Sequence, residues 1–508
     1  MDEYKRKYFK IIYLQIFLLI VFAVIGILLQ RYQNELVNIG NGFGWDGQIY
    51  GNVVLNYFNE IFIKGVDGYH IQRILPSTIV YAFMYIFRIS FTTNNAIISF
   101  TIYNTILILS ACYIWGLIAI ELKLSTKGVW LGFIGLFINF PILKLTFYYP
   151  VLTDTTAFFL GILIIYFYLK INNIGMFITM ILGSFTWASF YIMSLPLFIF
   201  RFKKDKKKIL EKRYNIYITI IGCFFWLVGA LFLIIRFSKG KFGGFAEGKN
   251  SIMANSFETY CLPFGVILAV LFIYYVMKNI LNYEYIFDIK LLLKSINTRN
   301  LLISIVAIIL IRFLIYNYIQ IFNVTSGFSS KGAIATVFNR GIRLPFLFGI
   351  SEVVYYGPIM IITLIFWKKF CGIINEYGYG LLLYIIAGII LSLNSESRFI
   401  INIFPAFVIF TAKAIDELDF SKYYYYLLFI ISVLYSKIWL LINSSPIPKP
   451  DVYDFEGLTR TSWQRYFMNI GPWMSDKMYL IQTSVVLITF MIIWCLIRRC
   501  YKMKNTYF

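Results

Sequence analysis

The sequence predicts an all-α fold, a polytopic bundle of about 11–13 transmembrane helices with juxtamembrane helices in its first external loop. Of the 508 residues, 60% are hydrophobic and only 14% are charged, whereas a soluble domain carries about 25% charged residues. Apolar stretches of bilayer-spanning length recur from one end of the chain to the other. These observations exclude a soluble domain with a single membrane anchor.

The distribution of the net charge of +22 argues against a nucleic-acid-binding protein. Lysine and arginine are concentrated in short segments between the apolar stretches, as the positive-inside rule expects for cytoplasmic loops, and both termini are expected in the cytoplasm. The main clusters are Lys5 to Lys10, Lys123 and Lys127, Lys203 to Arg213, the segment before Arg299, Lys368 and Lys369, and Arg498 to Lys504. The six cysteines show no CxxC spacing, so neither a disulfide nor a zinc framework is predicted.

The short apolar segment 75–95 decides the topology of the first half of the chain. If it crossed the membrane, Lys123 and Lys127 would be external, so we expect it to lie along the outer face or dip into it. Asp154 then emerges on the same external face as Asp46. The expected crossings are 8–30 outward, 96–121 inward, 128–147 outward and 155–170 inward, with residues 31–74 as a long external loop.

Residues 174–200 must begin and end in the cytoplasm because a basic segment follows them. A pair of half-length helices broken near Trp187, with Pro196 in the second limb, meets this requirement. Broken helices survive at membrane depth only where they are packed in protein or line a cavity.

The rest of the chain predicts single alternating spans. These lie near 214–236, 259–280, 300–321, 350–368, 377–394, 399–416, 422–443 and 478–497, with external loops 237–258, 322–349 and 444–477. We therefore divide the chain into a module of residues 1–210, which carries the candidate catalytic loops, and a variable module of residues 211–508.

Asp46 is the most informative residue, because ionisable groups near membrane depth are costly and mark functional sites. It lies just after the first span and is followed by Gly47. One interpretation is an N-cap for a helix that begins at Gly47; the other is a general base at the membrane boundary. We favour the second, because Trp45, Gln48 and Tyr50 cluster around it.

Three further groups are expected on the external face. Asp154 opens a span, which fits either a first-turn acid favoured by the helix dipole or a functional acid. Arg398 fits either an interfacial anchor or a guanidinium that binds a lipid phosphate, with Glu396 as a neighbour able to neutralise it. The same two interpretations hold for Arg73.

His70 is the only histidine in the chain. A metal site there would need Asp67 and Glu60 as further ligands, and their spacing is not diagnostic. No cofactor is predicted, and a divalent metal is not favoured.

In their order and spacing these residues resemble the GT-C superfamily of integral membrane glycosyltransferases, which includes protein O-mannosyltransferases and aminoarabinose transferases. Those enzymes carry an acid in the first external loop, matched here by Asp46, followed by an amphipathic segment, matched by Arg73 to Phe87. A second acid opens the span after the next external loop, as Asp154 does after Tyr149. An arginine opens a late proline-containing span, as Arg398 does.

The resemblance implies a polyprenyl-phosphate-linked sugar as donor and a glycan, lipid or protein as acceptor, with membrane lipids around the protein and no nucleic-acid partner. Asp46 would take the proton from the acceptor hydroxyl as its oxygen attacks the anomeric carbon, which inverts that centre. Asp154 would orient the acceptor or share the role of base, and Arg398 and Arg73 would bind the phosphate. The expected substrate-binding residues are Trp45, Gln48, Tyr50, Tyr149 and Glu396.

One departure concerns metal dependence: Gly47 follows Asp46, where some mannosyltransferases have a second acid. The expected location is a bacterial inner membrane, with the active site on the extracytoplasmic face. The main alternative is a transporter or flippase of a lipid-linked glycan, which also uses broken helices and interior charges. A glycan polymerase or ligase of another fold and an assembly subunit without catalysis are further alternatives.

Overall fold

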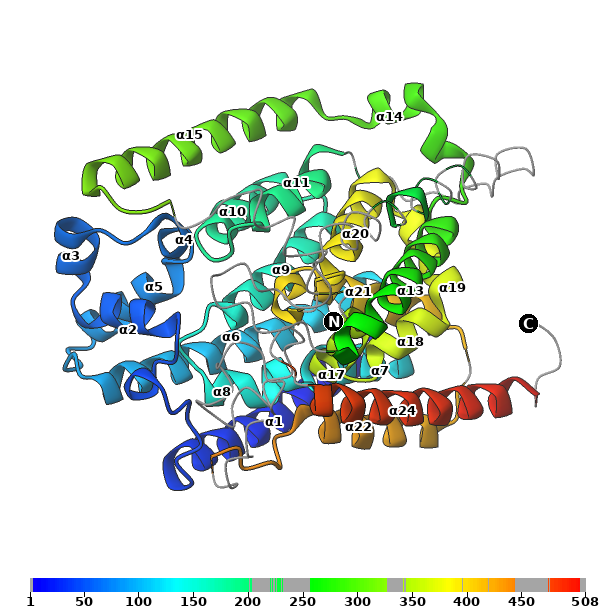
Figure 1. The fold of residues 1–508 in the computed structure, drawn as a ribbon, viewed down its shortest axis with the longest axis horizontal. Coiled ribbons are helices and arrows are strands. Elements are labelled where there is room, and N and C mark those ends of the chain that lie inside the picture. The colour runs from blue at the N-terminus through cyan, green and yellow to red at the C-terminus, as the bar shows by residue number, and fades with distance from the viewer. Residues whose placement is uncertain are drawn as a thin grey trace.

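The fold is helical throughout the part of the chain that the structure, a computed structural model, describes (Figure 1). That part comprises residues 3–200, 256–326, 344–394, 396–418, 420–443 and 476–502, with a few isolated positions between them. Phe200 and Ile296 form an isolated antiparallel bridge. The predicted all-α class is confirmed. Most of the predicted span 214–236 and most of loops 237–258, 322–349 and 444–477 lie outside the described residues.

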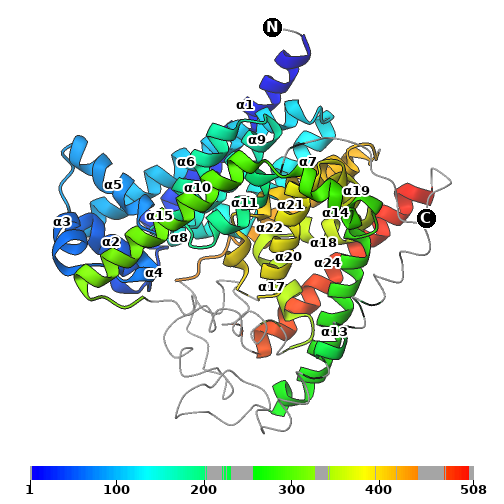
Figure 2. The same cartoon turned by 90° about the horizontal axis from the view of Figure 1, so that it is seen from above.

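The first external loop folds into short helices between two long ones. Its elements and their flanks are α1 (Glu3–Tyr32), η1 (Gly40–Gly42), α2 (Gly47–Leu55), α3 (Tyr57–Asn59), η2 (Glu60–Lys64), α4 (Gly68–Ile71), α5 (Leu75–Ile86) and α6 (Thr93–Glu121). Helices α2 to α5 gather at one end of the molecule, far from the C-terminal helices (Figures 1 and 2). With 12 residues, α5 is about 18 Å long, too short to cross about 30 Å of hydrocarbon.

The next segment contains two breaks. Its helices are α7 (Thr126–Phe137), η3 (Pro141–Leu145), α8 (Thr146–Tyr148), α9 (Asp154–Leu169), α10 (Asn173–Ser184) and α11 (Phe190–Ile199). The predicted break near Trp187 is present, and Pro196 lies inside the second limb. The predicted straight span 128–147 is instead bent by 54° between Phe137 and Pro141, because proline at 141 cannot continue the α-helical hydrogen bonding.

The C-terminal half contributes long and short helices. They are α13 (Ser256–Ile280), α14 (Ile289–Ser295), α15 (Thr298–Phe322), α17 (Leu347–Tyr356), α18 (Ile359–Ile365), α19 (Trp367–Glu376), α20 (Tyr379–Ser392), η6 (Ser397–Ile400), α21 (Phe404–Ile415), α22 (Lys422–Ser436) and α24 (Asp476–Lys502). The predicted span 350–368 is not one continuous helix: Gly357 at φ 85° and Pro358 end α17, and α18 and α19 follow as separate helices.

Polar side chains at the N-termini explain where many helices begin. The side chains of Thr92, Ser125, Asn172, Asn297 and Ser421 each accept a hydrogen bond from a backbone N–H in the first turn of the helix that follows. Such caps satisfy amide groups that have no partner inside the helix.

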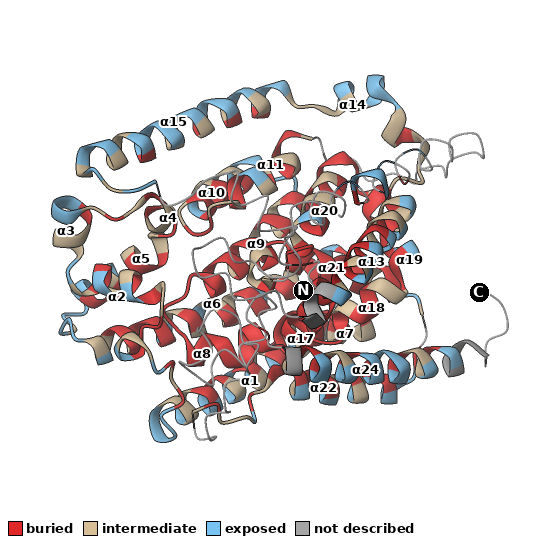
Figure 3. Ribbon diagram, viewed as in Figure 1, coloured by how far each residue is buried: buried red, intermediate tan, exposed pale blue. Residues whose placement is uncertain are grey.

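Five described helices are long and apolar enough to cross a membrane, or six if the bent pair is one span. They are Tyr8–Tyr32, Thr93–Glu121, Tyr260–Ile280, Thr298–Phe322 and Met478–Arg498, and the bent pair is Thr126–Phe137 with Pro141–Tyr148. The outer faces of α15 and α24 are exposed (Figure 3). Many of their exposed residues are large and apolar, which makes a surface suited to lipid and not to water. The chain is thus an integral membrane protein, and the total of 11–13 spans stays a prediction.

The core lies where the two halves of the chain pack together. Helices α7 and α9 contact α21, and α11 contacts α20 and α15. This region is the most completely buried part of the molecule (Figure 3). Residues from both sides of position 210 therefore build one interior, which allows Asp154 and Arg398 to meet.

Candidate functional site

Two glycines that flank Asp46 in the sequence lie against the aromatic ring of Tyr149. At Gly44, where φ is 75°, a Cβ atom would lie 2.2 Å from that ring, and at Gly47 it would lie 2.9 Å from it. The Gly47 N–H also donates to the Tyr149 hydroxyl at 3.1 Å. Glycine at both positions lets the loop approach the ring this closely, so the sequence Gly44-Trp45-Asp46-Gly47 is fixed on the turn before α9.

The Asp46 carboxylate is not used as a helix cap. Helix α2 begins at Gly47, as the capping interpretation requires, but Asp46 has helical backbone angles and its side chain makes no capping hydrogen bond. Asp46 is half-buried. Among the described residues, no side-chain hydrogen bond or ion pair involves its carboxylate. The carboxylate is therefore available for another partner.

Asp154 and Arg398 form a bidentate ion pair. Arg398 donates from Nε to Asp154 Oδ1 at 2.8 Å and from Nη2 to Oδ2 at 2.9 Å. The side chains are only 11% and 7% exposed. Such a planar, two-bond contact is the strongest form of carboxylate–guanidinium pairing. Asp154 is also the first residue of α9, as the first-turn interpretation expects.

Close backbone packing holds this pair together. At Gly161, about two turns along α9, a Cβ atom would lie 2.2 Å from the Asn402 carbonyl oxygen, so α9 and the segment after η6 approach directly. The Tyr356 hydroxyl donates to the Ser397 carbonyl at 2.7 Å, next to Arg398. The burial of Arg398 is therefore built into the helix packing.

Arg73 has a different environment. Its guanidinium carbon lies 4.2 Å from the ring centre of Tyr69 and 4.2 Å from that of Trp187, so the group is held between two aromatic faces. Arg73 is 4% exposed, and its Nε has no hydrogen-bond partner. No carboxylate within the described residues pairs with it. A buried cation without a counter-charge is costly, and its free edge is suited to an anion.

Trp187 joins the two arginines. It lies in the break between α10 and α11, which is tied to the first loop because the Leu75 N–H donates to the Phe185 carbonyl at 2.9 Å. The Arg398 guanidinium carbon is 6.0 Å from the Trp187 ring centre. Sequence reasoning located the break at Trp187 but did not include this residue, or Tyr69, among the site residues.

The tyrosine hydroxyls show that these groups share one region. Burial raises the pKa of Tyr149, the Gly47 N–H opposes this, and the charges of Asp46, Arg398 and Asp154 also act on that pKa. Burial likewise raises the pKa of Tyr69, while Arg73 lowers it and Asp46 raises it. Asp46, Asp154, Arg73 and Arg398 are thus within electrostatic range of the same cluster of rings.

The predicted substrate-binding residues occupy different parts of this cluster. Trp45 is half-buried with its ring centre 6.3 Å from that of Tyr149. Tyr50 is buried, and its hydroxyl has no partner among the described residues. Gln48 is exposed, and Glu396 is half-buried two residues before Arg398. These positions leave the roles of all five residues as predictions.

The two acids considered as metal ligands beside His70 have other partners. Its Nδ1 lies 2.6 Å from Asp67 Oδ2, Asp67 caps α4, and Glu60 pairs with Lys64 at 2.7 Å. Across the described ranges, no three His, Cys, Asp or Glu side chains are grouped so that they could hold a metal ion.

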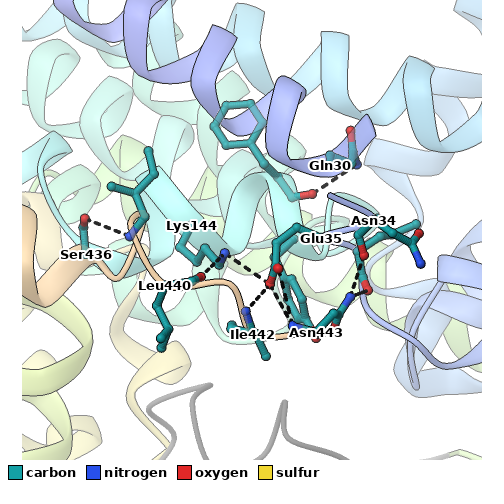
Figure 4. Close-up of polar contacts among 12 residues, drawn as sticks. Gln30, Asn34, Glu35, Lys144, Ser436, Leu440, Ile442 and Asn443 are labelled. Atoms are coloured by element: carbon teal, nitrogen blue, oxygen red, sulfur yellow. Dashed lines mark hydrogen bonds and ion pairs between the residues drawn. The ribbon is translucent and has the colours of Figure 1, made fainter. Parts of the chain in front are cut away.

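A second buried ion pair joins the residues after α1 to η3 (Figure 4). Lys144 Nζ lies 3.3 Å from Glu35 Oε1 and donates to the Leu440 carbonyl at 2.8 Å. The same Glu35 oxygen accepts from the N–H groups of Ile442 and Asn443 at 2.6 and 3.3 Å. This cluster ties the end of α1, η3 and the segment after α22 together.

Fold and site together define a helical integral membrane protein with a cluster of charged and aromatic side chains between its first loop and its late helices. No family model matches the chain, and no curated protein matches it.

One similar solved structure is the archaeal oligosaccharyltransferase AglB from Archaeoglobus fulgidus, in complex with an inhibitory peptide and a dolichol-phosphate. The two chains are 14% identical, the TM-score is 0.44, and the match covers 87% of this chain and 57% of that one. This chain therefore spans little more than half the length of its neighbour. A likeness of this strength establishes neither the family nor the activity.

Proposed function

We propose that this protein is a membrane glycosyltransferase of the GT-C type. It moves a sugar from a polyprenyl-phosphate donor to a glycan, lipid or protein acceptor on the extracytoplasmic face. The observation that carries the proposal is that, of four charged groups in the site, two form an ion pair and two do not. Asp154 and Arg398 neutralise each other, whereas Asp46 and Arg73 have no counter-charge among the described residues. A free base and a free cation in one cluster are what a single displacement requires.

In this mechanism the acceptor hydroxyl oxygen attacks the anomeric carbon and forms the new glycosidic bond. The bond between that carbon and the phosphate oxygen breaks, and polyprenyl phosphate leaves with the electron pair. Asp46 takes the hydroxyl proton, and the anomeric centre is inverted. General-base catalysis of this kind contributes about 10²- to 10⁴-fold in rate.

Arg73 is the better placed of the two predicted phosphate-binding residues. Its guanidinium plane is fixed by two rings, so little side-chain entropy is lost when it donates to phosphate oxygens. Arg398 already gives two of its N–H groups to Asp154. We therefore assign Arg398 and Asp154 to positioning the α9–η6 wall of the site, and Arg73 to the leaving phosphate.

The test uses the full chain purified in a neutral detergent with radiolabelled polyprenyl-phosphate-linked sugars. Water replaces the acceptor hydroxyl as the nucleophile in this assay, so hydrolysis of the donor and the resulting release of polyprenyl phosphate can be measured without knowing the acceptor. Asp46→Asn is expected to lower the rate about 10²- to 10⁴-fold with an unchanged unfolding midpoint. The control is Glu60→Gln, which alters an exposed ion pair in the same loop and is expected to retain the rate.

An Asp46→Asn variant that releases polyprenyl phosphate at the wild-type rate would contradict the proposal. The transporter alternative is separated by reconstitution into liposomes. A flippase would move a fluorescent polyprenyl-phosphate lipid across the bilayer without sugar transfer, and Asp46→Asn would leave that movement intact.

A further inference from the structure

A cavity remote from the first loop contains a buried acid that the proposed function does not use. The cavity, of about 50 Å³, lies between α13, α17, α18, α19, α20 and α21, in the region where these helices meet in Figure 1. Glu352 of α17 lines it and is 3% exposed. Neither carboxylate oxygen has a hydrogen-bond partner among the described residues.

The other polar side chains of the cavity wall cannot satisfy Glu352. The Thr363 hydroxyl donates to the Ile359 carbonyl at 2.9 Å, the Ser392 hydroxyl to the Ile389 carbonyl at 2.8 Å, and the Trp367 indole N–H to the Val276 carbonyl at 3.1 Å. Each donor is therefore occupied elsewhere. Any group that satisfies the carboxylate must enter the cavity from outside.

The rest of the wall is apolar and includes five aromatic residues. The rings of Phe272, Phe346 and Phe348 contact one another with centre distances of 4.9 to 5.7 Å. Trp367 and Phe407 complete the aromatic lining. The faces of such rings are electron-rich and attract cations, and the attraction grows when water is excluded.

We infer that this cavity binds a protonated primary amine carried on an apolar chain. The ammonium group supplies up to three N–H donors, enough for both Glu352 oxygens, and its positive charge compensates the carboxylate. The adjoining methylene groups contact the rings. A quaternary ammonium group has no N–H to donate, and an alcohol has no charge, so both satisfy the site less well.

The test measures binding to the full chain in a neutral detergent by ligand-observed NMR, with n-hexylammonium chloride as the probe. The Kd is expected to be at least about tenfold lower for n-hexylammonium than for n-hexanol or N-hexylacetamide, the difference that charge-assisted hydrogen bonds contribute. Glu352→Gln, which keeps the shape of the side chain, is expected to remove this difference. Glu376→Gln on α19, whose side chain does not line the cavity, is the matched control and is expected to preserve it.

A free amine and a lipid headgroup present the same chemistry. Nanodiscs of phosphatidylethanolamine and of phosphatidylcholine separate them: retention of phosphatidylethanolamine by the wild-type protein alone identifies a lipid source. Equal binding of the charged and neutral probes by the wild-type protein overturns the inference even if Glu352→Gln fails to fold. Undiminished amine binding by a folded Glu352→Gln overturns it as well.

Discussion

The two arginines of the site differ in which groups stabilise their positive charge. Arg398 is neutralised by Asp154 inside the helix packing, whereas Arg73 is stabilised by two ring faces that leave its N–H edge free. Removing Arg398 leaves the Asp154 carboxylate buried and unpaired. Removing Arg73 takes away a cation that pairs with no described carboxylate. The two substitutions should therefore affect different properties.

For Arg73→Met we expect a folded protein that binds an anionic isoprenoid more weakly. The affinity for farnesyl phosphate should fall about 10- to 100-fold, the value of charged hydrogen bonds, while the affinity for farnesol stays the same. Isothermal titration on the purified chain measures both. A parallel loss for the two ligands would show that Arg73 supports the fold of the site and not phosphate binding.

For Arg398→Met we expect a loss of stability of about 3–5 kcal/mol, because it isolates the buried Asp154 carboxylate. The double variant Arg398→Met, Asp154→Leu should recover most of that loss, since neither charge then remains. Thermal unfolding in detergent is the measurement. Full stability of the single variant would be incompatible with the burial of this pair.

Gly44 tests whether the approach of the first loop to Tyr149 matters. Gly44→Ala would force a methyl group against that ring at a residue whose φ is 75°, so the release of polyprenyl phosphate should fall and the unfolding midpoint should drop. Gly372→Ala is the matched control, because its Cβ would meet only the Tyr283 hydroxyl at 3.5 Å. In the helix α19 that substitution should be neutral or stabilise by about 0.5–1 kcal/mol. Equal behaviour of the two variants would remove the proposed role of Gly44.

At the scale of elements, the breaks in helices show what the sequence could and could not predict. The break near Trp187 followed from the need to keep basic segments on one side of the membrane. The breaks at Pro141 and at Gly357-Pro358 carried ordinary local signals, but a count of apolar residues merged each into one span. Hydropathy reports how apolar a segment is and not whether its backbone continues.

The sequence predicted only part of the candidate site, for a different reason. Asp46, Asp154, Arg73 and Arg398 were found because charges are rare in an apolar chain. The pairing of Asp154 with Arg398 was not predicted, because their bidentate contact depends on the close packing of α9 against the segment at Asn402. Trp187 and Tyr69 were missed because aromatic residues make up 20% of the sequence, so no pattern distinguishes a ring that stacks on Arg73.

Trp187 provides a prediction about the connection between α10 and α11. Trp187→Leu removes one of the two rings that hold Arg73, so the guanidinium gains freedom and farnesyl phosphate should bind several-fold more weakly. Combining Trp187→Leu with Arg73→Met should add little, because the ring acts through the arginine. A double-mutant cycle on the dissociation constants measures this coupling. Additive losses would mean that Trp187 acts independently of Arg73.

At the scale of the whole molecule, the Glu35–Lys144 pair joins the start of the chain to the segment that follows α22 (Figure 4). Its side chains are 2% and 4% exposed, and both charges make further hydrogen bonds to backbone groups. Lys144→Met should therefore lower stability by about 3–5 kcal/mol, because the Glu35 carboxylate stays buried without its counter-charge.

The chain offers an exposed pair of the same chemistry as a control. Lys64 and Glu60 also form a lysine–glutamate contact, at 2.7 Å, but the lysine side chain is 60% exposed, and such surface pairs contribute less than about 1 kcal/mol. Thermal unfolding of Lys144→Met and Lys64→Met should thus give a large and a negligible decrease in midpoint. Because Glu35 anchors residues 442 and 443 next to Tyr148, the residue before Tyr149, Lys144→Met should also slow polyprenyl phosphate release, and Lys64→Met should not. If both variants unfold at the wild-type temperature, the Glu35–Lys144 ion pair does not help to hold the start of the chain against the segment after α22.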